Sequence, residues 1–126
     1  MYIYILDDDP GVIHTLTAMA ELLGHEVKSF TAPDVFLGNI LELELGCIFL
    51  DYSMPGMNGL EVASALRHQG SSAAVVFLTI HDDQDFVAAA QEAGGTGYVV
   101  KRRLASDLMV AVQEARAGRS FVSALS

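Results

Sequence analysis

The sequence predicts an α/β protein in which five parallel β-strands alternate with five α-helices. Short apolar runs typical of strands alternate with longer stretches whose apolar residues recur every three or four positions. Four of the five short runs are almost continuously apolar, as expected for strands that helices cover on both faces. Strands joined by helices pair in parallel through right-handed crossovers. The 126 residues, 52% of them apolar, therefore fit one (βα)5 domain built on a doubly wound five-stranded sheet.

The expected strands are the short apolar runs themselves. They are Tyr2–Leu6, Glu26–Phe30, Gly46–Leu50, Ala73–Leu78 and Gly97–Val100. The second run, EVKSF, alternates polar and apolar residues, and we therefore expect it at an edge of the sheet.

The expected helices follow from apolar spacing and from residues that begin or end helices. They span Pro10–Leu23, Ala32–Leu43, Asn58–His68, Asp83–Ala93 and Ala105–Ala117. Asp9 precedes Pro10, which places a capping carboxylate before a proline at the first helical position. Asn58 is expected to cap the third helix in the same way.

Composition excludes several classes of protein. A formal net charge of −9 disfavours direct binding to nucleic-acid phosphates and favours cations or a partner with a basic face. No apolar run approaches the roughly 20 residues of a membrane span, and the N-terminus lacks a signal-peptide pattern. The one cysteine, Cys47, has apolar neighbours and is expected to be a buried thiol in a reducing compartment. We therefore expect a cytoplasmic protein without a membrane partner.

Chemically active side chains follow four of the five strands. Asp7 and Asp8 follow the first, Asp51 the third, Thr79 the fourth and Lys101 the fifth. Open parallel sheets bind ligands beyond the carboxyl ends of their strands, so these groups should converge. Three crowded carboxylates repel one another, and a hard divalent cation such as magnesium (or manganese) relieves that repulsion.

The same groups suit phosphoryl transfer. A carboxylate such as Asp51 can attack phosphorus and form an aspartyl phosphate. That reaction needs charge neutralisation and alignment more than acid–base help. Lys101 could supply a point positive charge, and Thr79 could donate a hydrogen bond to a phosphoryl oxygen.

Four segments, ILDDDP, FLDYSMPGMNGLEV, FLT and GYVVK, carry a family resemblance across nearly the whole chain. The chain resembles the receiver domain of two-component response regulators. Asp51 matches the phosphoacceptor and Thr79 the switch hydroxyl of that family. Tyr98 matches the switch aromatic, with a half-buried strand aromatic as the alternative interpretation. Asp7 and Asp8 match the pair of acidic residues that the family has at the end of its first strand, and Lys101 matches the lysine that the family has at the end of its fifth strand.

The resemblance implies a flavodoxin-like fold with strand order 2-1-3-4-5. It implies that a histidine kinase or a small phosphodonor phosphorylates Asp51. Magnesium would be bound by Asp8, Asp51 and the backbone carbonyl of Ser53, and by Asp7 through water. Thr79 would then move inward and Tyr98 would follow, which changes the face formed by the fourth helix, fifth strand and fifth helix.

Two positions depart from the family pattern. Ile80 stands where a small residue is usual, so we expect a narrower path to Asp51. Arg102 stands where many receivers carry proline, so we expect a trans peptide bond and a shifted loop. Arg102 and Arg103 form either a solvated patch or a partner contact. Arg103 and Asp107 are among the exposed charges that could pair between protomers of a homodimer.

The C-terminal part is similar to receivers of the LuxR/NarL type, which precede a helix-turn-helix domain. We assign residues 1–120 to the receiver and 121–126 to a tail or the start of a linker. Either the protein is a lone receiver, or it is one domain of a transcription factor that contacts DNA only through an effector domain absent from this chain.

Three functions stay open. The first is a phosphoryl-accepting switch, and the second is an interaction module of the same fold that does not use phosphorylation. The third, a phosphatase acting on external substrates, lacks the Asp-x-Asp motif of such enzymes, because residues 51–53 read DYS. We therefore expect a signalling phosphoacceptor and not an enzyme.

Overall fold

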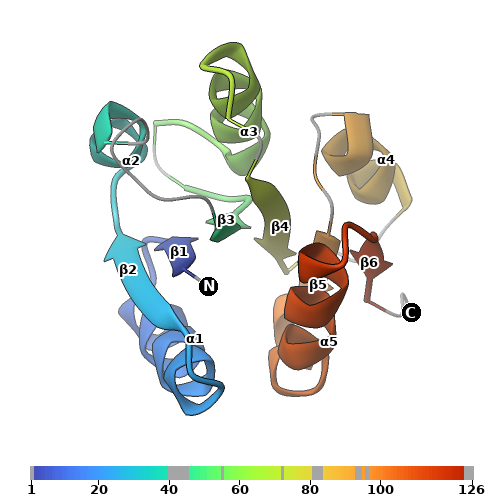
Figure 1. Ribbon diagram of the computed structural model, residues 1–126. Coiled ribbons are helices and arrows are strands. Elements are labelled where there is room, and N and C mark those ends of the chain that lie inside the picture. The colour runs from blue at the N-terminus through green and yellow to red at the C-terminus, as the bar shows by residue number, and fades with distance from the viewer. Residues whose placement is uncertain are drawn as a thin grey trace.

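The computed structural model describes residues 2–39, 46–54, 56–71, 73–80, 84–92, 95 and 97–123. One parallel sheet lies between two layers of helices (Figure 1). Its strands are β1 (Tyr2–Leu6), β2 (Glu26–Phe30), β3 (Gly46–Asp51), β4 (Ala74–Thr79), β5 (Gly97–Val100) and β6 (Phe121–Val122). The order β2-β1-β3-β4-β5-β6 contains the predicted order 2-1-3-4-5 and confirms the α/β parallel architecture. EVKSF forms β2 at the edge of the sheet, as predicted.

The predicted strand count was wrong by one. The sixth strand, β6, pairs in parallel with β5, so that Phe121 lies opposite Gly97 and Val122 opposite Tyr98. The amide of Ser123 donates to the carbonyl of Tyr98 at 2.9 Å and extends this pairing. A two-residue strand is too short to show a period of two, and its hydrogen bonds depend on residues more than 20 positions away. Local patterning therefore could not reveal it.

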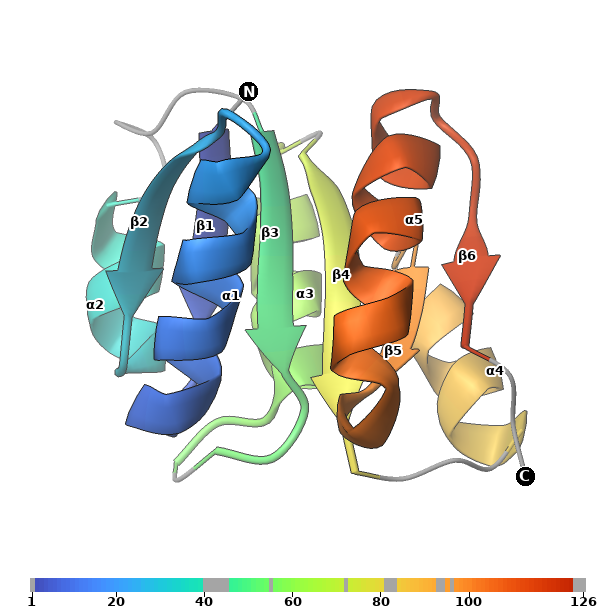
Figure 2. The ribbon, with the colours of Figure 1, turned by 90° about the horizontal axis from the view of Figure 1, so that it is seen from below.

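The helices fall into two layers. Their bounds are α1 (Pro10–Leu22), α2 (Pro33–Asn39), α3 (Gly59–His68), α4 (Gln84–Glu92) and α5 (Leu104–Arg116), with a 3-10 turn, η2 (Lys101–Arg103), before α5. Helices α1 and α5 cover one face of the sheet, and α2, α3 and α4 cover the other (Figures 1 and 2). Within the described residues, no helix combines the length and apolar character that crossing a membrane requires.

The helix starts agree with the predicted capping residues. The Asp9 side chain accepts a hydrogen bond from the Gly11 amide, with Pro10 at the first position of α1. Asn58 and Glu61 form a reciprocal capping box at α3. The predicted end of the second helix at Leu43 lies outside the described residues. So do both predicted ends of the fourth helix, Asp83 and Ala93.

The core has two halves because successive strand residues point to opposite faces. In β1, Tyr4 and Leu6 pack beneath α2 and α3, whereas Ile3 and Ile5 pack beneath α1 and α5. Cys47 is buried in the second half, and burial raises the pKa of its thiol to about 12. This confirms the prediction of a buried thiol.

All strand arrows that can be followed in Figure 2 point to the same edge of the sheet. The loops after β1 and β3 and the start of α5 therefore lie at that edge. The parallel pairing of every neighbouring strand thus gathers the predicted site residues in one place.

Candidate functional site

Three carboxylates meet where β1 and β3 end. Leu6 pairs with Leu50 in the sheet register, so Asp7 and Asp51, the next residues on the two strands, lie side by side. One oxygen from each of Asp7, Asp8 and Asp51 lies within 4.8 Å of the others. Asp7 is 0% exposed and Asp51 is 3% exposed, whereas Asp8 is open to solvent. The cluster therefore combines two buried carboxylates, those of Asp7 and Asp51, with the solvent-exposed carboxylate of Asp8.

Lys101 reaches this cluster from the end of β5. Its Nζ lies 3.1 Å from Asp7 Oδ2 and 3.1 Å from Asp51 Oδ1. Because Lys101 is the first residue of η2, its long side chain extends back across the edge of the sheet from β5 to β3 and β1. The structure thus brings together the four charged residues that the sequence analysis singled out.

Backbone amides hold two of these carboxylates in place. The Asp9 amide donates to Asp7 Oδ1 at 2.8 Å, and the Ser53 amide donates to Asp51 Oδ1 at 3.3 Å. The loop that carries Ser53 is itself tied down, because the Tyr52 amide donates to the Leu78 carbonyl at 2.8 Å. The carboxylate orientation therefore follows from local turns at the strand ends.

Opposing effects set the pKa of Asp51. Burial, and next the charge of Asp7, raise the pKa of Asp51 to about 6, although Lys101 and the Ser53 amide act in the opposite direction. Burial would lower the pKa of Lys101, but the two carboxylates outweigh it and raise that pKa. Near neutral pH, Asp51 is thus mostly ionised but held at a high free energy, and its partner lysine stays charged.

The residues present fit a hard divalent cation. Asp7 Oδ2 is buried and lies within ion-pair distance of Lys101, but it has no hydrogen-bond partner among the described residues. The Lys101 ammonium offsets only part of the free-energy cost of this buried anionic oxygen, and a bound cation would lower that cost further. The cluster offers only oxygen ligands, which Mg²⁺ prefers. It could therefore bind such a metal.

Thr79 lies beside Asp51 at the end of the neighbouring strand β4, and Tyr98 lies one strand further away, on β5. Leu78 pairs with Asp51, so Thr79 is one residue beyond Asp51 at the end of β4, and its side chain is buried. Tyr98 in β5 is buried in the half of the core that contains Phe77 and Val87. Tyr98 is therefore buried and not half-buried, and its role as the switch aromatic stays a prediction.

Ile80 and Arg102, the two departures from the family pattern, lie just beyond the ends of β4 and β5. Ile80 is 72% exposed directly after Thr79. No peptide bond among the described residues is cis, so the bond before Arg102 is trans as expected, and the chain enters η2 there.

Sequence reasoning missed a polar network on the far side of Lys101. Arg103 and Asp107 were expected among exposed charges that could pair between protomers, but Asp107 is only 6% exposed and pairs with Arg103 within the chain at 3.1 Å. Ser123 also donates to Asp107 at 2.6 Å. The spacing of four between Arg103 and Asp107 on a helix is a signal for their ion pair, whereas no local signal points to Ser123.

The sequence profile of the response regulator receiver domain matches residues 3–113. The chain belongs to the response regulator receiver domain family. Among curated relatives of this receiver, the response regulator protein TmoT of Ectopseudomonas mendocina is 34% identical over 90% of the chain and 51% of the relative. The transcriptional regulatory protein FixJ of Azorhizobium caulinodans is 32% identical over 94% of the chain and 56% of the relative. The chain thus spans about half the length of these relatives.

Solved structures agree with this assignment. The receiver superimposes on the non-phosphorylated receiver domain of RcsB from Escherichia coli with a TM-score of 0.90, at 22% identity and 98% coverage of both chains. A LuxR-family two-component response regulator from Aurantimonas is 27% identical, with a TM-score of 0.85, over 97% of this chain and 89% of that one. The predicted resemblance to LuxR/NarL-type receivers is confirmed.

Proposed function

We propose that this receiver is a signalling switch that accepts a phosphoryl group on Asp51. The observation that carries the proposal is the environment of Asp51. Its buried carboxylate lies beside those of Asp7 and Asp8 and 3.1 Å from the Lys101 ammonium. A nucleophilic carboxylate in an anionic pocket can approach a negatively charged phosphoryl group only if positive charge is supplied, and Lys101 supplies it.

The donor is a phosphohistidine of a sensor histidine kinase or a small phosphodonor. An Asp51 carboxylate oxygen forms the new bond to phosphorus while the bond from phosphorus to the donor atom breaks. The electron pair of the broken bond stays with the leaving group, and no general base is needed because the nucleophile is already ionised. The chain accepts the group itself and is not an enzyme for external substrates.

Mg²⁺ (or Mn²⁺) is the proposed cofactor. Asp8, Asp51 and the backbone carbonyl of Ser53 would hold it directly, with Asp7 contributing through water. When bound, the ion neutralises charge on the phosphoryl oxygens. The buried Asp7 Oδ2, which makes no hydrogen bond within the described residues, supports this assignment.

Output would pass through Thr79 and Tyr98. The Thr79 hydroxyl stands one residue beyond Asp51 on the adjacent strand, close enough in register to turn toward a group attached there. Tyr98 lies on the next strand, opposite Phe77. New hydrogen bonds at Asp51 would shift the population between two packings of the α4-β5-α5 face, which a partner reads.

The receiver extends through β6, whose Phe121 and Val122 pair with β5, and we propose that the segment after it leads to a helix-turn-helix effector domain that lies outside this chain. The names of the relatives support a role in transcription, with DNA bound only by that domain. A cytoplasmic location fits the buried thiol of Cys47. The partners are a sensor kinase and a second copy of the chain.

The mass of the intact protein tests whether Asp51 accepts a phosphoryl group. Incubation with acetyl phosphate or phosphoramidate and Mg²⁺ should add the mass of one phosphoryl group, and Asp51→Asn should abolish the gain. Asp85→Asn, at an exposed carboxylate of α4, is the matched control and should be phosphorylated normally. An unchanged mass with every donor would reject the proposal and favour an interaction module that works without phosphorylation.

A further inference from the structure

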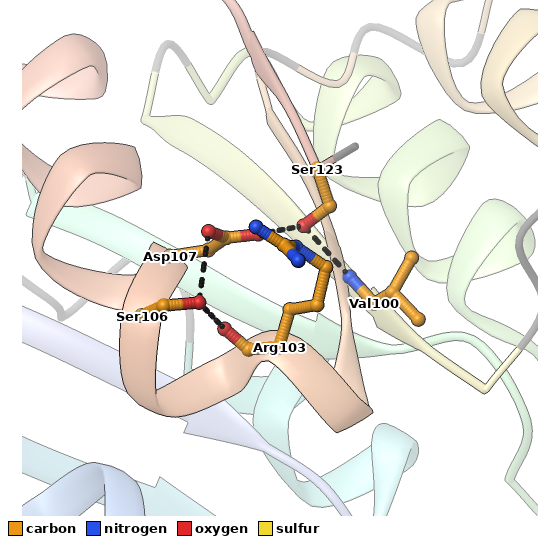
Figure 3. A network of polar contacts seen from close by, with 5 residues as sticks. All are labelled: Val100, Arg103, Ser106, Asp107 and Ser123. Carbon is orange, nitrogen blue, oxygen red and sulfur yellow. Dashed lines mark hydrogen bonds and ion pairs between the residues drawn. The ribbon is translucent and has the colours of Figure 1, made fainter. Parts of the chain in front are cut away.

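Asp107 is the centre of a polar network that joins the stretch from the end of β5 to the start of α5 with the chain that follows β6. Its carboxylate accepts hydrogen bonds from Ser123 Oγ at 2.6 Å, from Arg103 Nε at 3.1 Å and from Ser106 Oγ at 3.2 Å. Figure 3 shows these side chains converging between the start of α5 and the chain that follows β6. Asp107 is 6% exposed and Ser123 is 2% exposed. The network consists of Val100, Arg103, Ser106, Asp107 and Ser123, and is called the Asp107 network below.

Two of its hydrogen bonds act on the backbone immediately around Lys101. The amide of Val100, the residue before Lys101, donates to Ser123 Oγ at 3.1 Å. At the other end of η2, the carbonyl of Arg103 accepts a hydrogen bond from Ser106 Oγ at 3.1 Å. The Asp107 network therefore holds the 3-10 turn from both sides, and Lys101 is its first residue.

External contacts matter here because the turn has little rigidity of its own. Arg102 has no ring to fix its φ angle, and no side chain caps the start of η2. A three-residue 3-10 turn is closed mainly by the Leu104 amide, which donates to the Lys101 carbonyl. The contacts to Asp107 and Ser123 add to those of the Lys101 side chain, and without them the backbone of the turn, and Lys101 with it, would be held less tightly.

The charge state of Asp107 agrees with this role. Burial alone would raise its pKa, but the hydrogen bonds from Ser123, Arg103 and Ser106 outweigh that effect and lower the pKa. The carboxylate thus stays ionised at neutral pH and keeps all three donors.

We infer that Asp107 and Ser123 are positioning residues for Lys101, so that the rate of Asp51 phosphorylation depends on the C-terminal segment that contains Ser123. The inference rests on the proposed function, because it assigns a purpose to the placement of Lys101 against Asp51. Ser123 lies beyond residue 120, where the sequence places the end of the receiver, so a chain cut at that point would lose the contact.

Ser123→Ala tests the inference with the loss of one hydroxyl. The variant should take up phosphoryl groups from acetyl phosphate with Mg²⁺ several-fold more slowly, on the order of threefold to tenfold, as expected when a supporting contact is lost. Asp107→Asn should act in the same direction. Ser120→Ala, an exposed serine in the same segment, is the matched control and should keep the original rate. A Ser123→Ala rate equal to that of the control overturns the inference.

A double-mutant cycle separates positioning from a general loss of stability. In a Lys101→Ala background, Ser123→Ala should slow phosphorylation no further, because the residue that it positions is gone. If Ser123→Ala slows phosphorylation equally with and without Lys101, Ser123 does not act through that residue and the inference is wrong.

Hydrogen exchange of the Leu104 amide gives a readout independent of phosphorylation. That amide closes η2 by donating to the Lys101 carbonyl, whereas the Ser123 hydroxyl accepts from the Val100 amide, so faster exchange in Ser123→Ala than in Ser120→Ala would show that the turn has loosened. If the original chain accepts no phosphoryl group from any donor, the proposed function fails. The exchange measurement then decides whether Ser123 holds the turn, and unchanged exchange overturns the inference.

Discussion

Lys101 Nζ lies 3.1 Å from Asp51 Oδ1, and the same ammonium lies 3.1 Å from Asp7 Oδ2. One cation thus bridges two buried carboxylates that end different strands. The bridge partly neutralises a cluster that would otherwise destabilise the fold, and it places a positive charge where a phosphoryl group would arrive. Burial makes these interactions stronger than those of an ion pair on the surface.

Removal of Lys101 should therefore impair phosphorylation more than folding. We expect Lys101→Ala to slow phosphoryl uptake from acetyl phosphate by about 10²-fold, the usual effect of losing one donor that stabilises developing charge. The control is Lys28→Ala, at the one other lysine of the chain, which is exposed on β2 and should leave the rate unchanged. A Lys101→Ala rate close to that of Lys28→Ala would contradict a role for the ammonium.

The raised pKa of Asp51 makes the stability of the metal-free protein depend on pH. Its folded pKa of about 6 exceeds the ordinary value of 3.8, so the folded state binds the proton more tightly than the unfolded state. The stability contributed by protonated Asp51 is complete below pH 3.8 and is lost as the pH rises through about 6. Asp51→Asn, which cannot ionise, should be more stable than the original chain at pH 7 by about 1–3 kcal/mol.

Urea unfolding at pH 4 and pH 7 in the presence of a chelator measures that difference. The advantage of Asp51→Asn should be small at pH 4 and larger at pH 7. An equal advantage at both values would mean that Asp51 is not held at a high free energy by its surroundings.

Divalent cations should stabilise the folded protein through the acidic cluster. At a Mg²⁺ concentration 100 times the dissociation constant, binding adds about 2.7 kcal/mol to the free energy of unfolding. Asp7→Asn and Asp8→Asn should each reduce the gain in melting temperature, whereas Glu21→Gln on the exposed surface of α1 should not. Equal gains in all four proteins would locate the Mg²⁺ effect elsewhere.

Ile80 should slow access to Asp51 without affecting stability. Its side chain is 72% exposed, so Ile80→Ala should change the free energy of unfolding by no more than about 0.5 kcal/mol. The same substitution should raise the rate of phosphorylation by acetyl phosphate by a few-fold, because it widens the path beside Thr79. Equal rates in the two proteins would remove this role.

A pair of glycines tests how tightly α3 is set against the site. A Cβ at Gly59 would lie 2.7 Å from the Asp51 carbonyl oxygen, and one at Gly38 would meet nothing within 4 Å. Gly59→Ala should therefore destabilise the protein by about 1–3 kcal/mol through a forced backbone shift. Gly38→Ala, inside α2, should stabilise it by roughly 0.5–1 kcal/mol. Thermal unfolding of both variants measures these two changes in stability. Similar changes would show that α3 can shift away from Asp51 at little cost.

The fold and the charged residues of the site were open to prediction because each depends on a local pattern. Continuous apolar runs placed β1 and β5 at their observed bounds, since strands buried on both faces must be apolar along their length, and the alternating run EVKSF placed the edge strand β2. Asp7, Asp51 and Lys101 were predictable as neighbours because parallel strands align their carboxyl ends at one edge. No distance between these residues was needed to reach that conclusion.

Only the tertiary structure decided the rest. The burial of Tyr98, the raised pKa of Asp51 and the sixth strand depend on which segments cover a residue. Ser123 and Asp107 are 16 residues apart in the chain, and Ser123 and Val100 are 23 apart. Apolar periodicity reports which face of an element is buried, but a polar contact forms only where the folded backbone brings a donor to an acceptor. A serine in a short C-terminal segment carries no local signal of such a contact.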